Sequence, residues 1–164
     1  MKNERTQRHF LELIHRHQSI IHKICFIYSV KKADREDLQQ EIILQLWKSF
    51  PSFQGDSAFS TWMYRVALNT AINQTRRSRL LIDTTTSPEI PYDPAESYTL
   101  SEEIRILYKA ISQLKKVERA IILLWLEERS YEEIAASIGI TVKNVSVKLV
   151  RIRSRLAEMI NKYQ

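Results

Sequence analysis

Residues that break helices are scarce in this sequence. Only two glycines and four prolines occur among 164 residues, and three of the prolines lie between Pro88 and Pro94. Glycine and proline are the residues that disfavour helix most strongly, whereas leucine, glutamate, lysine, arginine and glutamine favour it. The rest of the chain is rich in these last types and in isoleucine. The composition therefore predicts an all-α fold with one interruption.

Cysteine and long apolar runs are also nearly missing. The single cysteine, Cys25, excludes an intrachain disulfide and a cysteine-rich zinc site. Its apolar neighbours predict a buried residue in a reducing compartment. The longest apolar run, Ala120–Leu126, is far shorter than the roughly 20 residues that cross a bilayer, and Met1–Phe10 is too polar for a secretory signal. We expect a cytoplasmic protein without membrane insertion.

Patterns that carry catalysis or bind cofactors are missing as well. The sequence has no glycine-rich phosphate loop and suggests no pairing of a nucleophile with a base. Asp37 and Glu41 have metal-ligand spacing but no third ligand nearby. Four histidines fit no standard ligand pattern and are predicted to lie at the surface: His9, His15, His17 and His22. We expect no enzyme activity, no cofactor and no metal.

What is present is an excess of positive charge. The chain has 25 lysines and arginines against 19 aspartates and glutamates, a formal net charge of +6. Such a balance favours binding to nucleic acid or to an anionic membrane surface. An ordinary basic protein would have the same composition, so the charge alone does not decide between these.

Apolar periodicity divides the chain into two helical domains. Residues 1–80 are predicted to hold one broken or two consecutive helices over Arg5–Val30, then helices over Asp34–Ser49, with Asp34 as the N-cap, and Ala58–Ser78. Residues 81–98 lack periodicity and are predicted to be a flexible linker. Residues 99–164 are predicted to form four helices: Leu100–Leu114, Lys116–Glu127, Tyr131–Ile138 and Val142–Asn161.

The last two predicted helices have the form of a helix-turn-helix. Ser130 followed by Glu133 resembles a capping box, Gly139 tolerates the positive φ of a turn, and Thr141 can cap the final helix. That helix is basic, as contacts with DNA phosphates require, and has polar residues at its front, where base edges are reached. A solvated basic helix in an ordinary bundle is the alternative interpretation.

Two segments of the first domain combine unusual residue types. The helix over Asp34–Trp47 has an acidic and amide face in an otherwise basic chain, which a merely solvated face would also explain. Phe53–Arg77 interleaves aromatic residues with cations, hydroxyls and amides, the groups that bind single-stranded nucleic acid. The same aromatics also repeat at helical spacing, so they could fill the core instead. Trp62 fits either interpretation.

Taken together, these segments resemble a known family. Asp34–Trp47, the Thr61-Trp62-Met63-Tyr64-Arg65 core of the next segment, and the C-terminal helix-turn-helix resemble, in order, the conserved parts of bacterial RNA polymerase sigma factors. The short connection between the two halves is similar to the extracytoplasmic-function group, which lacks the large intervening domain of principal sigma factors. The resemblance implies an alternative sigma factor that directs polymerase to promoters and helps to open them.

The resemblance also implies partners and site residues. Core RNA polymerase would be bound through the clamp helices of its largest subunit and the flap of the second largest, promoter DNA through both domains, and an anti-sigma protein would hold the chain inactive. The polymerase-binding residues would be Asp37, Gln40 and Glu41. The minus-ten element would be recognised and melted by Phe53, Ser57, Phe59, Ser60, Trp62, Arg65, Asn69, Arg76 and Arg77. The minus-thirty-five element would be read by Lys143, Asn144, Ser146, Lys148 and Arg151.

Three positions depart from the family pattern. Asn73 stands where many members have aspartate, and Asn144 and Val147 replace the commoner threonine and serine. The promoter sequence therefore does not carry over from relatives. A helix-turn-helix regulator that acts without joining polymerase is the rival interpretation, but it leaves the acidic helix and the Trp62 segment without a role.

The unpatterned segment generates a first prediction. A protease should cut first within residues 81–98 and leave two helical fragments. Deleting half of this segment, whose fully extended length is roughly 60 Å, should impair promoters that need both elements. Limited proteolysis with mass spectrometry checks the boundary. Cleavage inside the helices while residues 81–98 stay intact would show that the boundary is misplaced.

Overall fold

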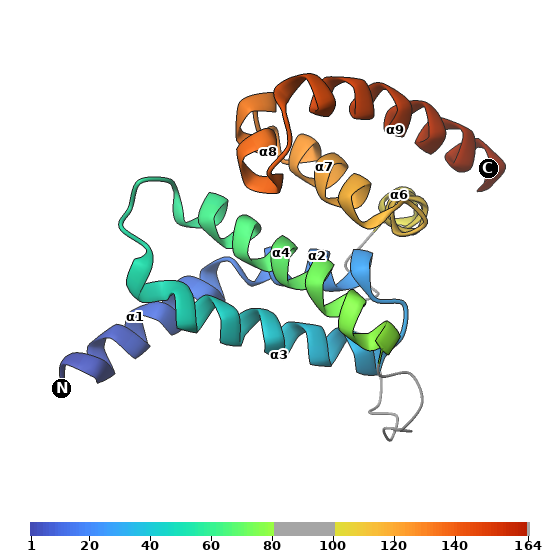
Figure 1. Cartoon of the computed structure of the whole chain (residues 1–164). Helices are drawn as coiled ribbons and strands as arrows, with labels where there is room; N and C mark the ends of the chain where they lie inside the picture. The colour runs from blue at the N-terminus through green and yellow to red at the C-terminus, as the bar shows by residue number, and fades with distance from the viewer. Residues whose placement is uncertain (81–100, 164) are drawn as a thin grey trace. The chain divides into compact units, whose positions relative to one another are not determined.

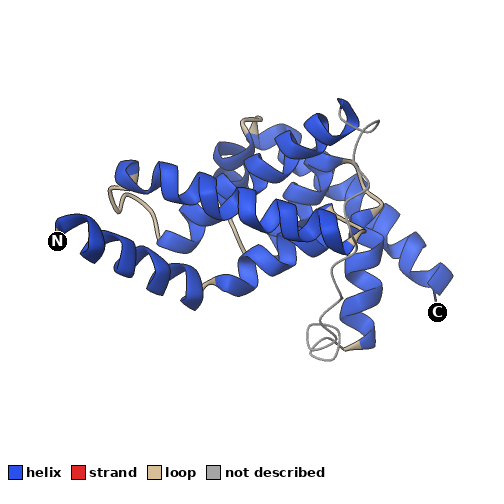
Figure 2. Cartoon of the chain, turned by 90° about the horizontal axis from the view of Figure 1, so that it is seen from below, coloured by secondary structure: helices blue, strands red, loops and turns tan. Residues whose placement is uncertain are grey.

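The computed structural model describes residues 1–80 and 101–163, and for residues 75–80 it describes the backbone only. Helices make up the regular structure of these residues, and no strand occurs among them (Figures 1 and 2). The chain divides into two compact units between Ser87 and Pro88. The all-α prediction is confirmed, while the predicted linker over 81–98 lies outside the described residues.

The first unit contains four α-helices and one turn of 3-10 helix. They are α1 (Lys2–Arg16), α2 (Gln18–Tyr28), α3 (Lys32–Ser49), η1 (Phe50–Ser52) and α4 (Phe59–Leu80). The helices α2, α3 and α4 pack against one another in all three pairings. The apolar pattern over Arg5–Val30 therefore forms two consecutive helices, which are separated at His17.

The core of this unit follows the periodicity of its helices. Leu38, Ile42 and Leu46 recur every fourth residue of α3 and are almost completely buried. On α4, Ala67 and Ala71 have no exposed surface, and their small side chains allow the neighbouring helices to approach. Burying each large aliphatic side chain stabilises the fold by about 1.5–3 kcal/mol, so these stripes decide which sides of the helices face outward.

The expected start of α3 is wrong by two residues. The helix begins at Lys32 with Lys31 as its N-cap, so Asp34 lies in the first turn and is not the cap. Its carboxylate still lies near the positive end of the helix dipole, where acidic side chains are stabilising. The connection from η1 to α4 contains Gly55 with φ of 78°, a conformation that glycine adopts without strain.

The second unit contains the helices α6 (Glu102–Ser112), α7 (Lys116–Leu126), α8 (Tyr131–Ile138) and α9 (Val142–Tyr163). The Ser130 hydroxyl accepts a hydrogen bond from the Glu133 N–H at 3.1 Å, and the Thr141 hydroxyl accepts one from the Asn144 N–H at 3.1 Å. Gly139 has φ of 83° between α8 and α9. The predicted caps, glycine turn and helix-turn-helix are confirmed.

A buried carboxylate connects two helices of this unit. Glu118 at the start of α7 accepts a hydrogen bond from Arg155 of α9 at 2.6 Å and another from the Lys115 N–H at 3.1 Å. Burial raises the pKa of Glu118, but the hydrogen bonds from Arg155 and Lys115 and the charges of both side chains outweigh it, so the pKa lies below its ordinary value. The pair therefore stabilises this unit while Glu118 is ionised.

Among the described residues, the helices are all too short or too polar to cross a membrane. Cys25 is buried in α2, as its apolar neighbours predicted. The four histidines were expected at the surface. His9 and His15 are exposed, as predicted, whereas His17 and His22 are half-buried.

The Glu118 pair generates a second prediction. Glu118→Ala should destabilise the second unit by about 1–3 kcal/mol at neutral pH, because Arg155 loses its charged hydrogen-bonding partner. The loss stays below that of a fully buried pair, because Arg155 is partly exposed and water can solvate it. Because the pKa of Glu118 is lowered by folding, this stabilisation is complete above the unfolded pKa and is lost as the pH falls through the folded pKa.

Hydrogen exchange of α7 and α9 at pH 7 and pH 3 measures both effects. The exposed Glu158 on α9 provides the matched control, and Glu158→Ala should leave exchange unchanged. If wild type and Glu118→Ala differed in exchange protection by the same amount at both pH values, stability would not be linked to the ionisation of Glu118.

Candidate functional site

The outward side of α3 brings together the residues that were predicted to bind polymerase. Asp37 and Gln40 are exposed, while Glu41 is half-buried and accepts a hydrogen bond from the Gln45 amide at 3.0 Å. Leu44, two helical turns after Asp37, is 44% exposed on the same side. We call Asp37, Gln40, Glu41 and Leu44 the α3 face.

Leu44 was not singled out in the sequence. Its apolar character suggests the core, but its spacing from Asp37 places it on the polar side of the helix and opposite the buried stripe of Leu38, Ile42 and Leu46. Single exposed apolar residues are ordinary on protein surfaces, but beside the polar residues of this side Leu44 adds apolar area to a surface that was predicted to bind protein. Seven-residue spacing from Asp37 was the signal that could have identified it.

Four aromatic residues gather where η1, the following loop and the start of α4 meet. We call Phe50, Phe53, Phe59 and Trp62 the aromatic cluster. The ring centroids of Phe53 and Trp62 are 5.1 Å apart, and those of Phe59 and Trp62 are 5.4 Å apart. Every member is half-buried. Phe50 continues the cluster inward to the buried Phe10 of α1, whose ring centroid is 5.1 Å away.

This arrangement is compatible with both interpretations of the aromatic segment, as part of the core and as a surface for single-stranded nucleic acid. The rings pack on one another and on the core, mostly at tilted or edge-on angles, and each keeps part of its surface outside. His9 of α1 and His17, which separates α1 from α2, lie at the border of the cluster, with ring centroids 6.2 Å from Phe50 and 5.5 Å from Phe59, respectively. A partly exposed ring that is held from behind is a preorganised surface for stacking.

Polar residues continue from the aromatic cluster along α4. Arg65, Asn69 and Asn73 are exposed at four-residue spacing and therefore share one side of the helix. Ser57 is exposed in the loop before α4, and Ser60 is half-buried in its first turn. The side chains of Arg76 and Arg77 lie outside the described residues, although both residues belong to the helix.

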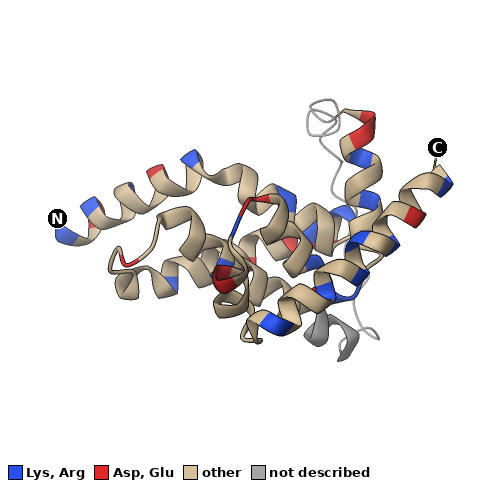
Figure 3. Ribbon diagram, turned by 90° about the horizontal axis from the view of Figure 1, so that it is seen from above, with Lys and Arg blue, Asp and Glu red and all other residues tan. Residues whose placement is uncertain are grey.

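The helix α9 presents the residues that were predicted to read upstream DNA. Lys143, Asn144, Ser146 and Arg151 are exposed, and Lys148 is half-buried at the edge of the same side. Figure 3 shows basic residues distributed along this helix, which ends at the C-terminus. We call Lys143, Asn144, Ser146, Val147, Val150 and Arg151 the α9 face.

Two cations further along α9, Arg153 and Arg155, contact the fold instead. The Arg153 guanidinium lies 4.8 Å from the centroid of the Trp125 ring on α7, and Arg155 is bonded to Glu118. Both residues fix α9 on α7. Positive charge for an anionic ligand is therefore concentrated at the front of the helix, which is where a recognition helix meets DNA.

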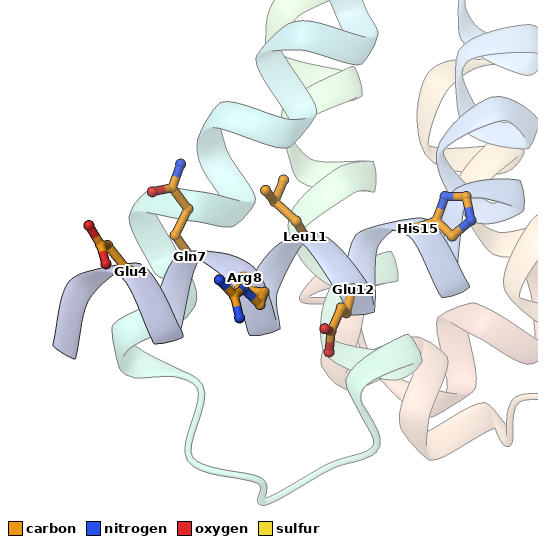
Figure 4. A pocket seen from close by; sticks show the side chains of 6 residues that line it. All are labelled: Glu4, Gln7, Arg8, Leu11, Glu12 and His15. Atoms are coloured by element: carbon orange, nitrogen blue, oxygen red, sulfur yellow. The ribbon is translucent and has the colours of Figure 1, made fainter. Parts of the chain in front are cut away.

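A shallow depression on α1 does not form a comparable site. Its lining comes from one side of that single helix, as Figure 4 shows, and comprises Glu4, Gln7, Arg8, Leu11, Glu12 and His15. Ligand sites usually enclose most of a ligand between convergent walls, which one helix cannot supply. Within the described part of the chain, no three histidine, cysteine or acidic side chains gather as metal ligands would.

Comparisons with known proteins cover both units. Residues 13–80 match the family described as Sigma-70 region 2, and residues 104–156 match Sigma-70, region 4. The chain is 35% identical to the ECF RNA polymerase sigma-E factor of Escherichia coli strain K12, across 92% of this chain and 85% of that protein. It is 33% identical to the sigma-E factor of Haemophilus influenzae, across 90% and 85%.

Two solved structures share the fold. One is the sigma factor RpoE in complex with the anti-sigma factor NepR from Bartonella quintana, with a TM-score of 0.72, 24% identity, and coverage of 94% of this chain and 98% of that one. The other is CnrH in complex with the cytosolic domain of CnrY, with a TM-score of 0.66, 22% identity, and coverage of 96% and 91%.

These matches include the acidic helix and the Trp62 segment, which a regulator that acts without polymerase leaves without a role. They therefore do not favour that rival interpretation. Both of these curated relatives are named as ECF RNA polymerase sigma-E factors. The predicted resemblance is confirmed: the chain belongs to the extracytoplasmic-function group of RNA polymerase sigma factors, and it is an alternative sigma factor.

Proposed function

We propose that this sigma factor works through three surfaces on two domains. Residues 1–80 bind core polymerase with the α3 face and open the minus-ten element with the aromatic cluster and α4. Residues 99–164 read the minus-thirty-five element with the α9 face. The observation that carries this assignment is the position of each set: the predicted residues of α3 and α9 lie exposed or half-buried on the sides of these helices away from the buried stripes, and the minus-ten aromatics are half-buried at the surface of the first unit.

The α3 face fits a helical protein partner, and we assign it to the coiled-coil clamp helices of the largest polymerase subunit. Asp37 and Glu41 supply negative charge, Gln40 supplies hydrogen bonds, and Leu44 supplies apolar area at the C-terminal end of the face. Charged side chains in such an interface orient the partner, and apolar area excludes water. The second domain binds the flap of the second largest subunit.

The α3 face generates a third prediction. Asp37→Ala combined with Glu41→Ala should weaken binding to core polymerase by about 2–5 kcal/mol, because the polymerase side chains that pair with these carboxylates are left without a counterpart. Leu44→Ser alone should weaken it by about 1 kcal/mol, because the side chain is already half covered before binding. Fluorescence anisotropy with labelled sigma factor measures both.

The control for this measurement is Glu12→Ala, an exposed acid on α1. It should bind core polymerase with wild-type affinity. Wild-type affinity in the double variant, with its helix content intact, would remove the α3 face from the interface.

The aromatic cluster fits the capture of an unpaired base. Extracting a base from duplex DNA costs a few kcal/mol, and stacking on a protein aromatic ring returns about 1–3 kcal/mol. Phe53, Phe59 and Trp62 offer such rings. Each lies against Phe50, which in turn packs on the buried Phe10. Because the rings are already ordered, little conformational entropy is lost when a base binds.

The polar residues around the cluster supply the remaining contacts. Asn69 can both donate to and accept from a base edge, and Arg65 lies one helical turn before it on the same side of α4. Ser57 and Ser60 border the rings, and we assign Arg76 and Arg77 to the adjacent phosphates. The segment thus joins stacking, base-edge contacts and charge neutralisation along one helix.

Base capture generates a fourth prediction. With core polymerase present, Asn69→Ala and substitutions of Gln54 or Ser57 should still form the closed complex but open it slowly, because the captured base loses its contacts. Permanganate reactivity of minus-ten thymines measures opening, and a premelted promoter should restore most of the lost rate.

Asn161→Ala, an exposed asparagine at the end of α9, is the control and should open promoters normally. Normal opening by the Asn69 and loop variants, or a failure of premelting to rescue them, would contradict base capture.

The front of α9 fits the major groove of the minus-thirty-five element. Lys143, Lys148 and Arg151 supply positive charge for phosphates, while Asn144 and Ser146 lie near the start of the helix, where base edges are reached. Phosphate contacts place the domain on DNA, and the base contacts select the sequence.

The remaining partner is an anti-sigma protein. One solved structure of similar fold is the sigma factor RpoE in complex with the anti-sigma factor NepR, and another is CnrH in complex with the cytosolic domain of CnrY. We extend this partner to the present chain, and we place the chain in the cytoplasm, where bacterial RNA polymerase works.

A further inference from the structure

Two valines stand on the outward side of α9. Val147 is 43% exposed and Val150 is 69% exposed. The buried stripe of the same helix consists of Val145, Leu149 and Ile152, with Leu156 one turn further. The two valines therefore do not belong to the core of the second unit.

Their position on the helix sets them apart from scattered apolar surface residues. Val147 lies four residues after Lys143 and four before Arg151, and Val150 lies three residues after Val147. Residues at these spacings are neighbours on a helix surface. The valines thus form a short apolar stripe between two exposed cations, on the α9 face that meets DNA in the proposed function.

Valine in this place is not explained by the helix itself. Its branched side chain lowers helix propensity relative to the lysine, arginine or glutamine that commonly occupy exposed positions. Single exposed apolar residues are ordinary on protein surfaces, but two adjacent ones between phosphate-binding cations face a highly charged ligand. The stripe therefore adds to the binding affinity only if the ligand places an apolar group against it.

The major groove offers one such group. Each base pair presents hydrogen-bond donors and acceptors there, and thymine alone adds an apolar methyl group at C5. We propose that Val147 and Val150 contact the 5-methyl groups of thymines, so that the upstream element recognised by this sigma factor contains thymine where these side chains enter the groove. This inference rests on the proposed function of α9 as the recognition helix.

Replacing thymine by deoxyuridine removes only that methyl group and leaves the base pairing intact. An upstream element is first selected from a randomised minus-thirty-five region by the holoenzyme. Each thymine of the selected element is then replaced singly by deoxyuridine, and the affinity of the holoenzyme is measured. Loss of one buried methyl contact corresponds to roughly a fourfold loss of affinity.

The same substitutions are tested with variant proteins. Val147→Ala and Val150→Ala shorten the stripe and favour helix, so α9 stays folded. We expect wild-type protein to lose affinity at one or two deoxyuridine positions, and we expect the corresponding alanine variant to bind thymine and deoxyuridine equally there. Val30→Ala, an equally small change at a residue that is 84% exposed in the first unit, should keep the wild-type discrimination.

The outcomes separate this inference from the proposed function. A holoenzyme that selects no upstream element at all would contradict the role of α9, and the thymine inference with it. A selected element without thymine, deoxyuridine substitutions without effect, or discrimination that persists in both alanine variants would overturn the thymine inference alone.

Discussion

The structure depends on one constraint, which is that each long helix of a small domain must bury one narrow apolar stripe. On α3 the stripe is Leu38, Ile42 and Leu46, and on α9 it is Val145, Leu149, Ile152 and Leu156. Because successive residues of an α-helix are rotated by a fixed angle, burying the stripe determines which residues face outward. The α3 face and the α9 face are consequences of how the helices pack.

The aromatic cluster shows the same constraint at the end of a helix. The rings of Phe50, Phe53 and Trp62 extend the core of the first unit to the surface through Phe10. A ring that is packed on one side is ordered before any ligand arrives. Core packing and base binding therefore do not exclude each other, and one residue such as Trp62 can contribute to both.

Local patterns in the sequence predicted most of the fold. The scarcity of glycine and proline, the caps at Ser130 and Thr141 and the turn at Gly139 each act within a few residues, so they can be recognised without the structure. The cap of α3 was misplaced at Asp34, because that helix begins without a side-chain cap and its sequence does not mark the first turn.

Contacts between distant residues could not be predicted in this way. Glu118 and Arg155 are 37 residues apart, and nothing in the sequence distinguishes them from solvated charges. The exposure of Leu44 and Val150 depends on which side of each helix is buried, which apolar character alone does not decide. The half-burial of the aromatic rings likewise depends on how η1, the following loop and the start of α4 meet, which local patterns do not determine.

The proposed function requires this chain to read promoter DNA as part of polymerase. It is tested most directly by reconstituting purified chain with core polymerase, mapping the transcripts and measuring the mass of the promoter complex. We expect specific start sites only when both components are present, with one copy of the chain in each complex. Specific binding to duplex DNA by a dimer of the chain without polymerase, together with no transcripts from the mixture, would contradict it.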